Sequence, residues 1–338
     1  MKEEWRQVDL LATDTGYSYL KGAWREDGEL KLVRIPSAVA QFEDNTSGLE
    51  GALTPDIYYK GNYYLAGEKA KKFESRLIDT YQEDFSVVYT PVLMYELMRE
   101  NKVLPQKVCV SIALSEFDKE IVVFDPEEGI KKGKKKKLIR DYASSFEING
   151  ERFEFEVYVF PQGVGIWLDV GTPENAVIVD IGDRTVDLVF VREGQIIGAG
   201  YTTGFQNEGT MKIADALARE IKKRTGRPVD IKKAKMWLEK DSIIYGGEEI
   251  DLRSIKQKVG LHYIREIITK LNAKPEIKDF IDTYGKVIFA GGGARFVPEE
   301  IKEHFGIEVP PEPEFSNVRG FLKALEEESD DKAETENA

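Results

Sequence analysis

The sequence predicts an α/β protein made of two related halves, each of which begins with a β-meander that carries an acidic turn. An apolar strand, an Asp-x-Gly turn and a second strand occur twice, at Asp14 and at Asp180. The next turn glycine, Gly28 or Gly194, follows its aspartate by 14 residues in both copies (28 − 14 and 194 − 180). Residues 286–306 add a strand, a triple glycine and a helix to the second half. The equal spacing indicates an internal duplication.

Composition limits the class of protein. A length of 338 residues favours roughly two domains. The formal charge of −13 argues against nonspecific binding to nucleic acid or anionic lipid over the whole surface. A single cysteine, Cys109, lies in an apolar strand; it excludes an intramolecular disulfide and fits a reducing compartment. No signal peptide or membrane span is recognisable, so we expect a cytoplasmic protein.

The acidic turns have two interpretations. Asp and Gly are common in tight turns because they tolerate unusual backbone angles. The same pattern suits a loop whose N–H groups bind phosphate oxygens while a carboxylate holds a metal. If both turns face a cleft between the halves, two carboxylates and two sets of amides converge there. This arrangement favours a nucleotide polyphosphate with hydrated Mg²⁺.

The rest of the first half follows in order. Residues 36–75 are short, polar and glycine-containing, which indicates a small insertion, and residues 86–100 have helical spacing. A buried strand is expected at 107–114, and a hairpin with an Asn-Gly turn at 146–160. The lysine-rich run 131–137 is interpreted as a solvated loop between strands. A site for nucleic acid or lipid, or a protein interface, stays open for this run.

The second half continues with an amphipathic helix at 208–224 and a helical lobe to about residue 284. A tight turn needs one glycine, so the three glycines after the strand that starts at residue 286 favour a ligand that approaches the backbone. A short helix and an acidic tail end the chain. The two histidines, His262 and His304, are isolated, so no Cys/His metal site is expected.

In this order the elements resemble the actin-like ATPase superfamily, most of all the ParM/StbA-type plasmid-segregation actins and the archaeal actin-like proteins. Five segments carry the resemblance: DTGYSYLK (14–21), FPQGVGIWLDVG (160–171), DIGDRTVDL (180–188), FAGGGARF (289–296) and NVRGFLKAL (317–325). The resemblance implies an actin-like fold, with two duplicated ribonuclease H-like domains flanking a nucleotide cleft and carrying small subdomain insertions.

The resemblance also implies domain boundaries. Domain I would cover 1–160 with an insertion at about 36–85, and domain II would cover 161–325 with a helical subdomain at about 207–284. Residues 326–338 would form a disordered acidic tail.

The site residues are implied in the same way. In the two loops the phosphate-binding residues would be Thr15, Gly16, Tyr17, Lys21, Gly182, Asp183, Arg184 and Thr185. The adenosine would lie against Gly291, Gly292, Gly293 and Arg295. Asp14 and Asp180 would hold Mg²⁺ through water, and Gln162 would orient the attacking water. Asp180 and Asp183 complete the catalytic set.

The two loops depart from the family pattern. Tyr17 replaces a small residue, but only its main-chain N–H needs to face phosphate. Asp183 and Arg184 stand where relatives have glycine or threonine, and we expect the Arg184 side chain to point outward into a salt bridge.

The function implied is a slow ATPase that forms head-to-tail filaments for plasmid or DNA segregation or for a cytoskeletal role. A DNA-binding adaptor at the filament ends would be a further partner, while direct contact with nucleic acid or membrane is not expected. GTP in place of ATP stays open. A small-molecule kinase and a non-polymerising nucleotide-binding adaptor are the alternatives. A chaperone ATPase is not expected, because it would need a peptide-binding domain after the ATPase domain.

Overall fold

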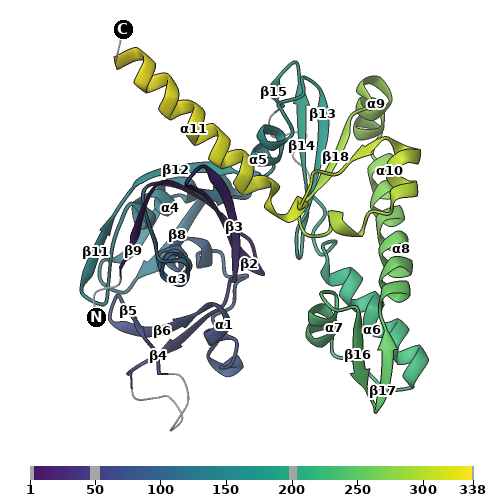
Figure 1. Cartoon of the computed structure of the whole chain (residues 1–338), viewed down its shortest axis with the longest axis horizontal. Coiled ribbons are helices and arrows are strands. Elements are labelled where there is room, and N and C mark those ends of the chain that lie inside the picture. Colours follow the sequence, from purple (N-terminus) through teal and green to yellow (C-terminus); the bar gives the residue numbers. More distant parts are fainter. Residues whose placement is uncertain (1–3, 46–53, 198–203, 337–338) are drawn as a thin grey trace. The chain divides into compact units, whose positions relative to one another are not determined.

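The computed structural model describes residues 4–45, 54–197 and 204–336, with side chains to residue 327. The chain forms two compact units (Figure 1). Unit 1 comprises Met1–Asp169 and Asn317–Ala338, and unit 2 comprises Val170–Ser316. Each unit has its own hydrophobic core.

Unit 1 is built on a five-stranded sheet with the order β12-β7-β1-β2-β3. The central strand β1 pairs in parallel with β7 and antiparallel with β2. The strands of this sheet are β1 (Arg6–Thr15), β2 (Tyr19–Glu26), β3 (Glu29–Pro36), β7 (Val103–Ile112) and β12 (Glu156–Pro161). Cys109 lies on β7 and is fully buried, as the sequence predicted.

Smaller elements surround this sheet. A three-stranded sheet, β4-β6-β5, occupies the predicted insertion, and two hairpins, β8–β9 and β10–β11, follow β7. These strands are β4 (Val39–Phe42), β5 (Ile57–Tyr59), β6 (Asn62–Ala66), β8 (Glu120–Asp125), β9 (Gly129–Lys134), β10 (Ser145–Ile148) and β11 (Glu151–Glu154). The β10–β11 turn has Asn149 and Gly150 at positive φ, which is the hairpin turn expected for Asn-Gly.

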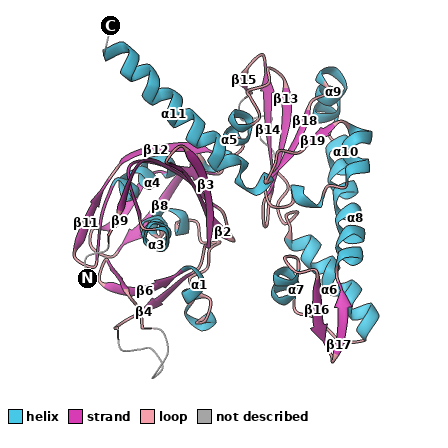
Figure 2. Cartoon of the chain, viewed as in Figure 1, coloured by secondary structure: helices cyan, strands magenta, loops and turns pink. Residues whose placement is uncertain are grey.

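The helices of unit 1 include α3, which is buried along most of its length (Figure 2). It has Pro91 in its first turn and ends at Asn101, and Lys102 after it takes the left-handed conformation. The helices of the unit are α1 (Gly67–Ala70), η1 (Glu74–Arg76), α2 (Phe85–Val88), α3 (Thr90–Asn101), η2 (Leu114–Glu116), α4 (Lys135–Ser144), α5 (Val164–Asp169) and α11 (Ser316–Glu336).

Unit 2 repeats the sheet of unit 1. Its order, β15-β14-β13-β18-β19, matches β3-β2-β1-β7-β12 strand for strand, and the parallel and antiparallel pairs correspond. The strands are β13 (Ala176–Ile181), β14 (Val186–Arg192), β15 (Gln195–Ile196), β18 (Val287–Ala290) and β19 (Ile307–Glu308). The duplication inferred from sequence spacing is therefore present in the topology.

The turns of the two meanders also correspond. Asp27 and Gly28 have positive φ values of 52° and 80° between β2 and β3. Glu193 and Gly194 have positive φ values of 52° and 70° between β14 and β15. Two consecutive residues at positive φ define the turn that matches the twist of a two-stranded ribbon.

The remaining elements of unit 2 form a lobe and cover the sheet (Figure 1). The lobe contains the predicted amphipathic helix α6, but also a hairpin, β16–β17, in a segment predicted to be helical. The β-branched and aromatic residues of SIIY and a turn with Gly246 and Gly247 at positive φ favour the hairpin. The elements are α6 (Met211–Thr225), α7 (Ile231–Trp237), β16 (Ser242–Tyr245), β17 (Glu248–Asp251), α8 (Arg253–Asn272), α9 (Pro275–Tyr284), η3 (Ala294–Phe296), α10 (Glu299–Phe305) and η4 (Pro313–Phe315).

The C-terminal segment differs from the prediction, which placed 161–325 in the second domain and 326–338 in a disordered tail. Helix α11 continues to Glu336, and residues from Asn317 onward belong to unit 1. The reason is its packing on α5. A Cβ atom at Gly320 would lie 1.8 Å from the Gly165 carbonyl oxygen, so glycine allows the two helices to touch. The Phe160 and Phe321 rings also stack at 5.6 Å.

The lysine run 131–137 also differs from the predicted loop, because it covers the end of β9 and the start of α4. Five of its six lysines pair with acidic side chains of unit 1: Lys131 with Glu128, Lys132 with Glu120, Lys134 and Lys136 with Asp118, and Lys135 with Glu116. The charge of the run is thus largely balanced within the unit, which disfavours a nucleic-acid or lipid site.

Candidate functional site

The acidic turn of unit 1 lies at the end of β1, where Asp14 accepts three side-chain hydrogen bonds. Lys21, its register partner on β2, donates from Nζ to Oδ2 at 2.9 Å. Ser111 on β7 donates from Oγ to Oδ1 at 2.7 Å. Gln162, just after β12, donates from Nε2 to the same Oδ1 at 2.7 Å. Three neighbouring strands therefore bring these groups together around one carboxylate that is 2% exposed.

The electrostatics of Asp14 favour the ionised form. Burial by itself raises the pKa of a carboxyl group. Here the charge of Lys21 and the hydrogen bonds from Ser111, Lys21 and Gln162 outweigh burial and hold the pKa of Asp14 below its ordinary value. The same carboxylate acts with burial to raise the pKa of the Cys109 thiol well above its ordinary value. Asp14 is thus a fixed negative charge at neutral pH and an acceptor only.

The main chain of this turn is partly committed to the protein. The Thr15 N–H donates to Ser111 Oγ at 3.0 Å, and the Gly16 N–H donates to the Tyr19 carbonyl at 3.0 Å. Thr15 Oγ1 is buried and has no hydrogen-bond partner within the described residues. Buried hydroxyl groups normally have a partner. The turn therefore holds one polar group that no described residue satisfies.

The acidic turn of unit 2 joins β13 to β14 and has the same closing bond. The Gly182 N–H donates to the Thr185 carbonyl at 2.9 Å, which repeats the Gly16–Tyr19 bond of unit 1. A Cβ atom on Gly182 would lie 3.3 Å from that carbonyl oxygen, the same distance as for Gly16. The two turns are thus structural copies.

The charges next to the two turns differ. The register partner of Asp180 across β13 and β14 is Asp187, where unit 1 has Lys21. Like charges directly opposite each other on an antiparallel pair are destabilising unless another charge offsets them. Asp187 also accepts a hydrogen bond from Thr185 Oγ1 at 2.8 Å. This acidic pair is chemically suited to a cation.

Asp183 is tied into unit 2. Lys235 Nζ lies 2.7 Å from its Oδ1, and Thr210 Oγ1 donates to the same atom at 3.2 Å. The Gly209 and Met211 N–H groups donate to the Arg184 and Asp183 carbonyls. These bonds hold the turn against the start of α6, so the Asp183 side chain braces the loop.

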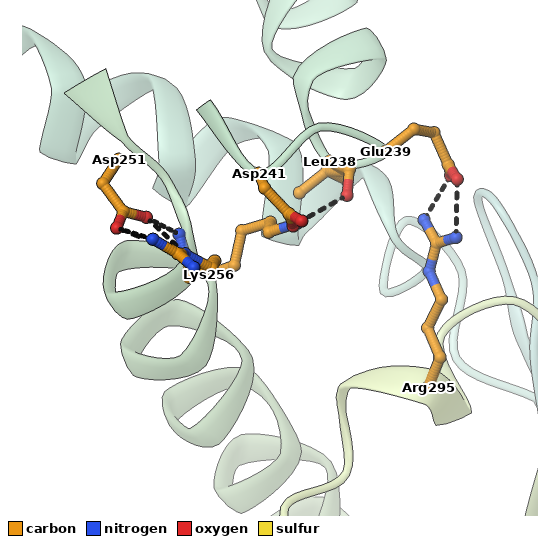
Figure 3. A network of polar contacts seen from close by, with 7 residues as sticks. Leu238, Glu239, Asp241, Asp251, Lys256 and Arg295 are labelled. Atoms are coloured by element: carbon orange, nitrogen blue, oxygen red, sulfur yellow. Dashed lines mark hydrogen bonds and ion pairs between the residues drawn. The ribbon is translucent and has the colours of Figure 1, made fainter. Parts of the chain in front are cut away.

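Arg184 extends along the surface, and its Nε donates to Asn207 Oδ1 at 2.9 Å. This contact is with a side-chain amide, and the outward salt bridge expected for Arg184 stays a prediction. Arg295 forms an ion pair with Glu239, with Nη1 donating to Oε2 at 2.9 Å (Figure 3). This pair joins η3 to the end of α7, so the Arg295 guanidinium has a protein partner in addition to its predicted ligand role.

The triple glycine follows β18, and glycine is present at its three positions for different structural reasons. A Cβ atom on Gly291 would lie 2.3 Å from Asp180 Oδ1, and the residue has φ 76°. A Cβ atom on Gly293 would lie 2.0 Å from Ile181 Cγ2. Close packing on β13 therefore requires both glycines. Gly292 has no atom within 4 Å of such a Cβ, so the sequence argument for a ligand applies to Gly292 alone.

Sequence reasoning missed Ser111 and Asp187. Ser111 lies 97 residues from Asp14 (111 − 14) and no local motif marks it. The register of the second meander could have placed Asp187 opposite Asp180. Among the described residues, no group of three or more His, Cys, Asp or Glu side chains is arranged to hold a metal ion. No helix in the described ranges is long and apolar enough to span a membrane.

Two family models match the chain. The model of the N-terminal domain of actin-like proteins matches residues 12–165. The model of the C-terminal domain of the archaeal MreB-like actin homologue matches residues 178–303. A comparison with curated proteins finds no significant match in sequence.

Solved structures share the fold. An archaeal actin homologue is 18% identical with a TM-score of 0.71 in its native crystals, and 17% identical with a TM-score of 0.66 in complex with ADP. The subunit of a 15-stranded ParM filament from Clostridium botulinum is 17% identical with a TM-score of 0.63. Bacillus thuringiensis ParM with AMPPNP is 17% identical with a TM-score of 0.62. Each comparison covers 95% of this chain and 100% of the other. The actin-like fold expected from the sequence is therefore confirmed.

Proposed function

We propose, from the premise that the chain belongs to the actin-like ATPase superfamily, that it is a nucleotide-dependent filament protein that binds ATP with Mg²⁺ and hydrolyses it slowly. The observation that carries the proposal is the duplicated acidic turn, with one closing hydrogen bond repeated in the two units. Relatives with the same fold have been solved with ADP and with AMPPNP. They support an adenine nucleotide as the ligand, and GTP is a competitor to be tested.

Each of the two turns would bind phosphate oxygens of a nucleotide. Because the Thr15 and Gly16 N–H groups already donate to protein acceptors, we assign the phosphate contacts of the first turn to the Tyr17 main chain and Lys21. The second turn would contribute the N–H groups of residues 183–185. The Thr15 hydroxyl is a further polar group for the ligand at this place. Gly292, where an added Cβ atom would have no neighbour within 4 Å, would be the position at which the backbone approaches the adenosine.

The donor set fits Mg²⁺ held through water. Asp180 and Asp187 are register partners whose carboxylate oxygens are ligands of the kind that Mg²⁺ prefers, and Mg²⁺ keeps several waters and needs few carboxylates. Both carboxylate oxygens of Asp14 already accept hydrogen bonds. Asp14 would therefore contact the Mg²⁺ ion through water, as the resemblance implies. When bound, the ion supplies positive charge to the phosphate oxygens.

Gln162 would position the attacking water. A side-chain amide is not a base at neutral pH, so hydrolysis would rest on orientation and electrostatic stabilisation. Such a site turns over slowly until other groups complete it. The ParM relative that forms a 15-stranded filament supports a second copy of the chain as the partner. We propose DNA segregation, with an adaptor protein at the filament ends, or a cytoskeletal role as the cellular task.

The test is right-angle light scattering of the pure protein after addition of ATP with Mg²⁺, with phosphate release followed in the same cuvette. We expect scattering to rise and then to decay as phosphate accumulates. ADP with Mg²⁺, and ATP with excess chelator, are the controls that should give neither signal. Phosphate release without scattering would contradict filament formation and favour a kinase of the same superfamily. Nucleotide binding without either signal would contradict an ATPase and favour a non-polymerising adaptor.

A further inference from the structure

Ser111 makes more contacts at the acidic turn of unit 1 than its single hydroxyl group suggests. Its proton goes to Asp14 Oδ1 at 2.7 Å. Its oxygen accepts the Thr15 N–H at 3.0 Å and the Gln162 Nε2 amide at 3.3 Å. The residue is 2% exposed and lies on β7, between β1 and β12. One hydroxyl thereby connects the phosphate turn, the carboxylate of Asp14 and the amide of Gln162.

The orientation of the Gln162 amide follows from these partners. An ionised carboxylate can only accept hydrogen bonds, so the end of the amide that faces Asp14 must be the nitrogen. The Ser111 proton is used by Asp14, so Ser111 also presents a lone pair to the amide. Both neighbours therefore turn Nε2 inward and Oε1 outward. No group of the described chain donates a hydrogen bond to Oε1 in this arrangement.

We infer that Ser111 is a positioning residue for hydrolysis, which acts through Asp14 to hold the Gln162 amide with its nitrogen inward and its carbonyl oxygen toward the attacking water. An inverted amide would present N–H donors to a water whose own protons need an acceptor. Two inner acceptors oppose the inversion: the Asp14 carboxylate, and the Ser111 oxygen, whose proton is already donated to Asp14. Asp14 is thus the anchor of Gln162 as much as a neighbour of the metal.

The inference rests on the proposed function, and it predicts a specific kinetic pattern. Ser111→Ala removes the hydrogen bond that fixes the Asp14 carboxylate and one of the two inner acceptors of Nε2, so the amide is held less firmly, by Asp14 alone. Small misplacements of a positioning group cost up to about 100-fold in rate, so we expect kcat to fall about tenfold. The Kd for ATP should change by less than about twofold, because the lost orientation matters in the transition state. Ser111→Thr keeps the hydroxyl and should retain most of the parent kcat.

A double substitution separates positioning from a structural role. If Ser111 acts through Gln162, Ser111→Ala should cause no further loss of kcat in a Gln162→Ala background. A multiplicative loss in the double variant, or a parent rate in Ser111→Ala, would overturn the inference. A variant that loses thermal stability while kcat per folded molecule is unchanged would overturn it too. Where Ser111→Ala does not fold, Ser111→Cys keeps the shape with a weaker donor and should give an intermediate loss.

A second readout does not depend on hydrolysis. With ¹⁵N-glutamine labelling and Gln162→Ala for assignment, the exchange of the Gln162 side-chain amide protons with water can be followed in nucleotide-free protein. We expect slow exchange in the parent and in Ser111→Thr, and exchange at least about fivefold faster in Ser111→Ala, because protection reports the hydrogen-bonded amide. Equal exchange in parent and Ser111→Ala refutes the geometry. A parent without ATPase activity but with protected protons would refute the proposed function and leave the geometry in place.

Discussion

Replacing Lys21 by methionine would test the electrostatics of the first acidic turn. The Lys21 side chain is 17% exposed and that of Asp14 is 2% exposed, and their atoms lie 2.9 Å apart. Removing one partner of a buried ion pair costs about 3–5 kcal/mol. Asp14 would keep its bonds from Ser111 and Gln162, and Lys21 is partly solvated, so we expect unit 1 to lose about 2–3 kcal/mol of stability at neutral pH.

The pH dependence identifies the cause. In the parent, the pKa of Asp14 is below its ordinary value, so its contribution to stability is present at neutral pH and is lost as the pH falls through the folded-state pKa. In Lys21→Met the cation is absent and burial dominates, which moves the pKa of Asp14 upward. The deficit of the variant relative to the parent should therefore be largest at neutral pH and should shrink as the pH falls toward about 4.

Native-state hydrogen exchange of peptides from β1 and β7 measures the loss of stability of unit 1, separately from the stability of unit 2. The matched control is Lys31→Met, because Lys31 pairs with Glu29 on the surface, with 37% and 76% of the two side chains exposed. It should leave the stability of unit 1 unchanged within error. A Lys21→Met deficit that equals the control, or one that is the same at neutral and mildly acidic pH, would refute the reasoning.

Three further predictions address the site. Gln162→Ala should lower kcat by about 100-fold or less without changing the affinity for ATP, as measured by steady-state kinetics and calorimetry. A variant that hydrolyses ATP at the parent rate would show that Gln162 does not position the water. Asp180→Ala should abolish the Mg²⁺ dependence of nucleotide binding, and an unchanged calorimetric affinity in Mg²⁺ would contradict the metal assignment. Gly291→Ala should destabilise unit 2 by about 1–3 kcal/mol because its Cβ would overlap Asp180 Oδ1, whereas Gly292→Ala should fold normally. Equal denaturation midpoints for the two glycine variants would show that the packing argument is wrong.

The fold could be predicted because its signal is periodic and repeated. Equal spacing from Asp14 to Gly28 and from Asp180 to Gly194 reflects two meanders with the same turn geometry. A pattern of this kind survives even where the residues around it have changed, because the turns and registers set the spacing. The same logic does not extend to the last helix, since a run of acidic residues is compatible with helix or disorder.

The candidate site was only partly predictable. Asp14 and Lys21 are neighbours in one meander, so sequence spacing identifies them. Ser111 comes from a strand that is distant in sequence, and only the β1–β7 pairing brings it close. Glycine is ambiguous for a different reason. The sequence cannot tell a glycine required by packing on β13, as at Gly291, from one that leaves room for a ligand.

The two units have kept one scaffold and changed its charges, and this difference suggests a division of labour. In unit 1 the turn aspartate faces Lys21, and Ser111 and Gln162 add hydrogen bonds from the neighbouring strands. In unit 2 the equivalent aspartate, Asp180, faces Asp187, and its register partner on β18 is Ala290, which has no polar side chain to donate. A carboxylate paired with a lysine is suited to hold an amide still, while two carboxylates opposite each other are suited to a hydrated cation. The duplicated turn would then serve water positioning in one copy and metal binding in the other.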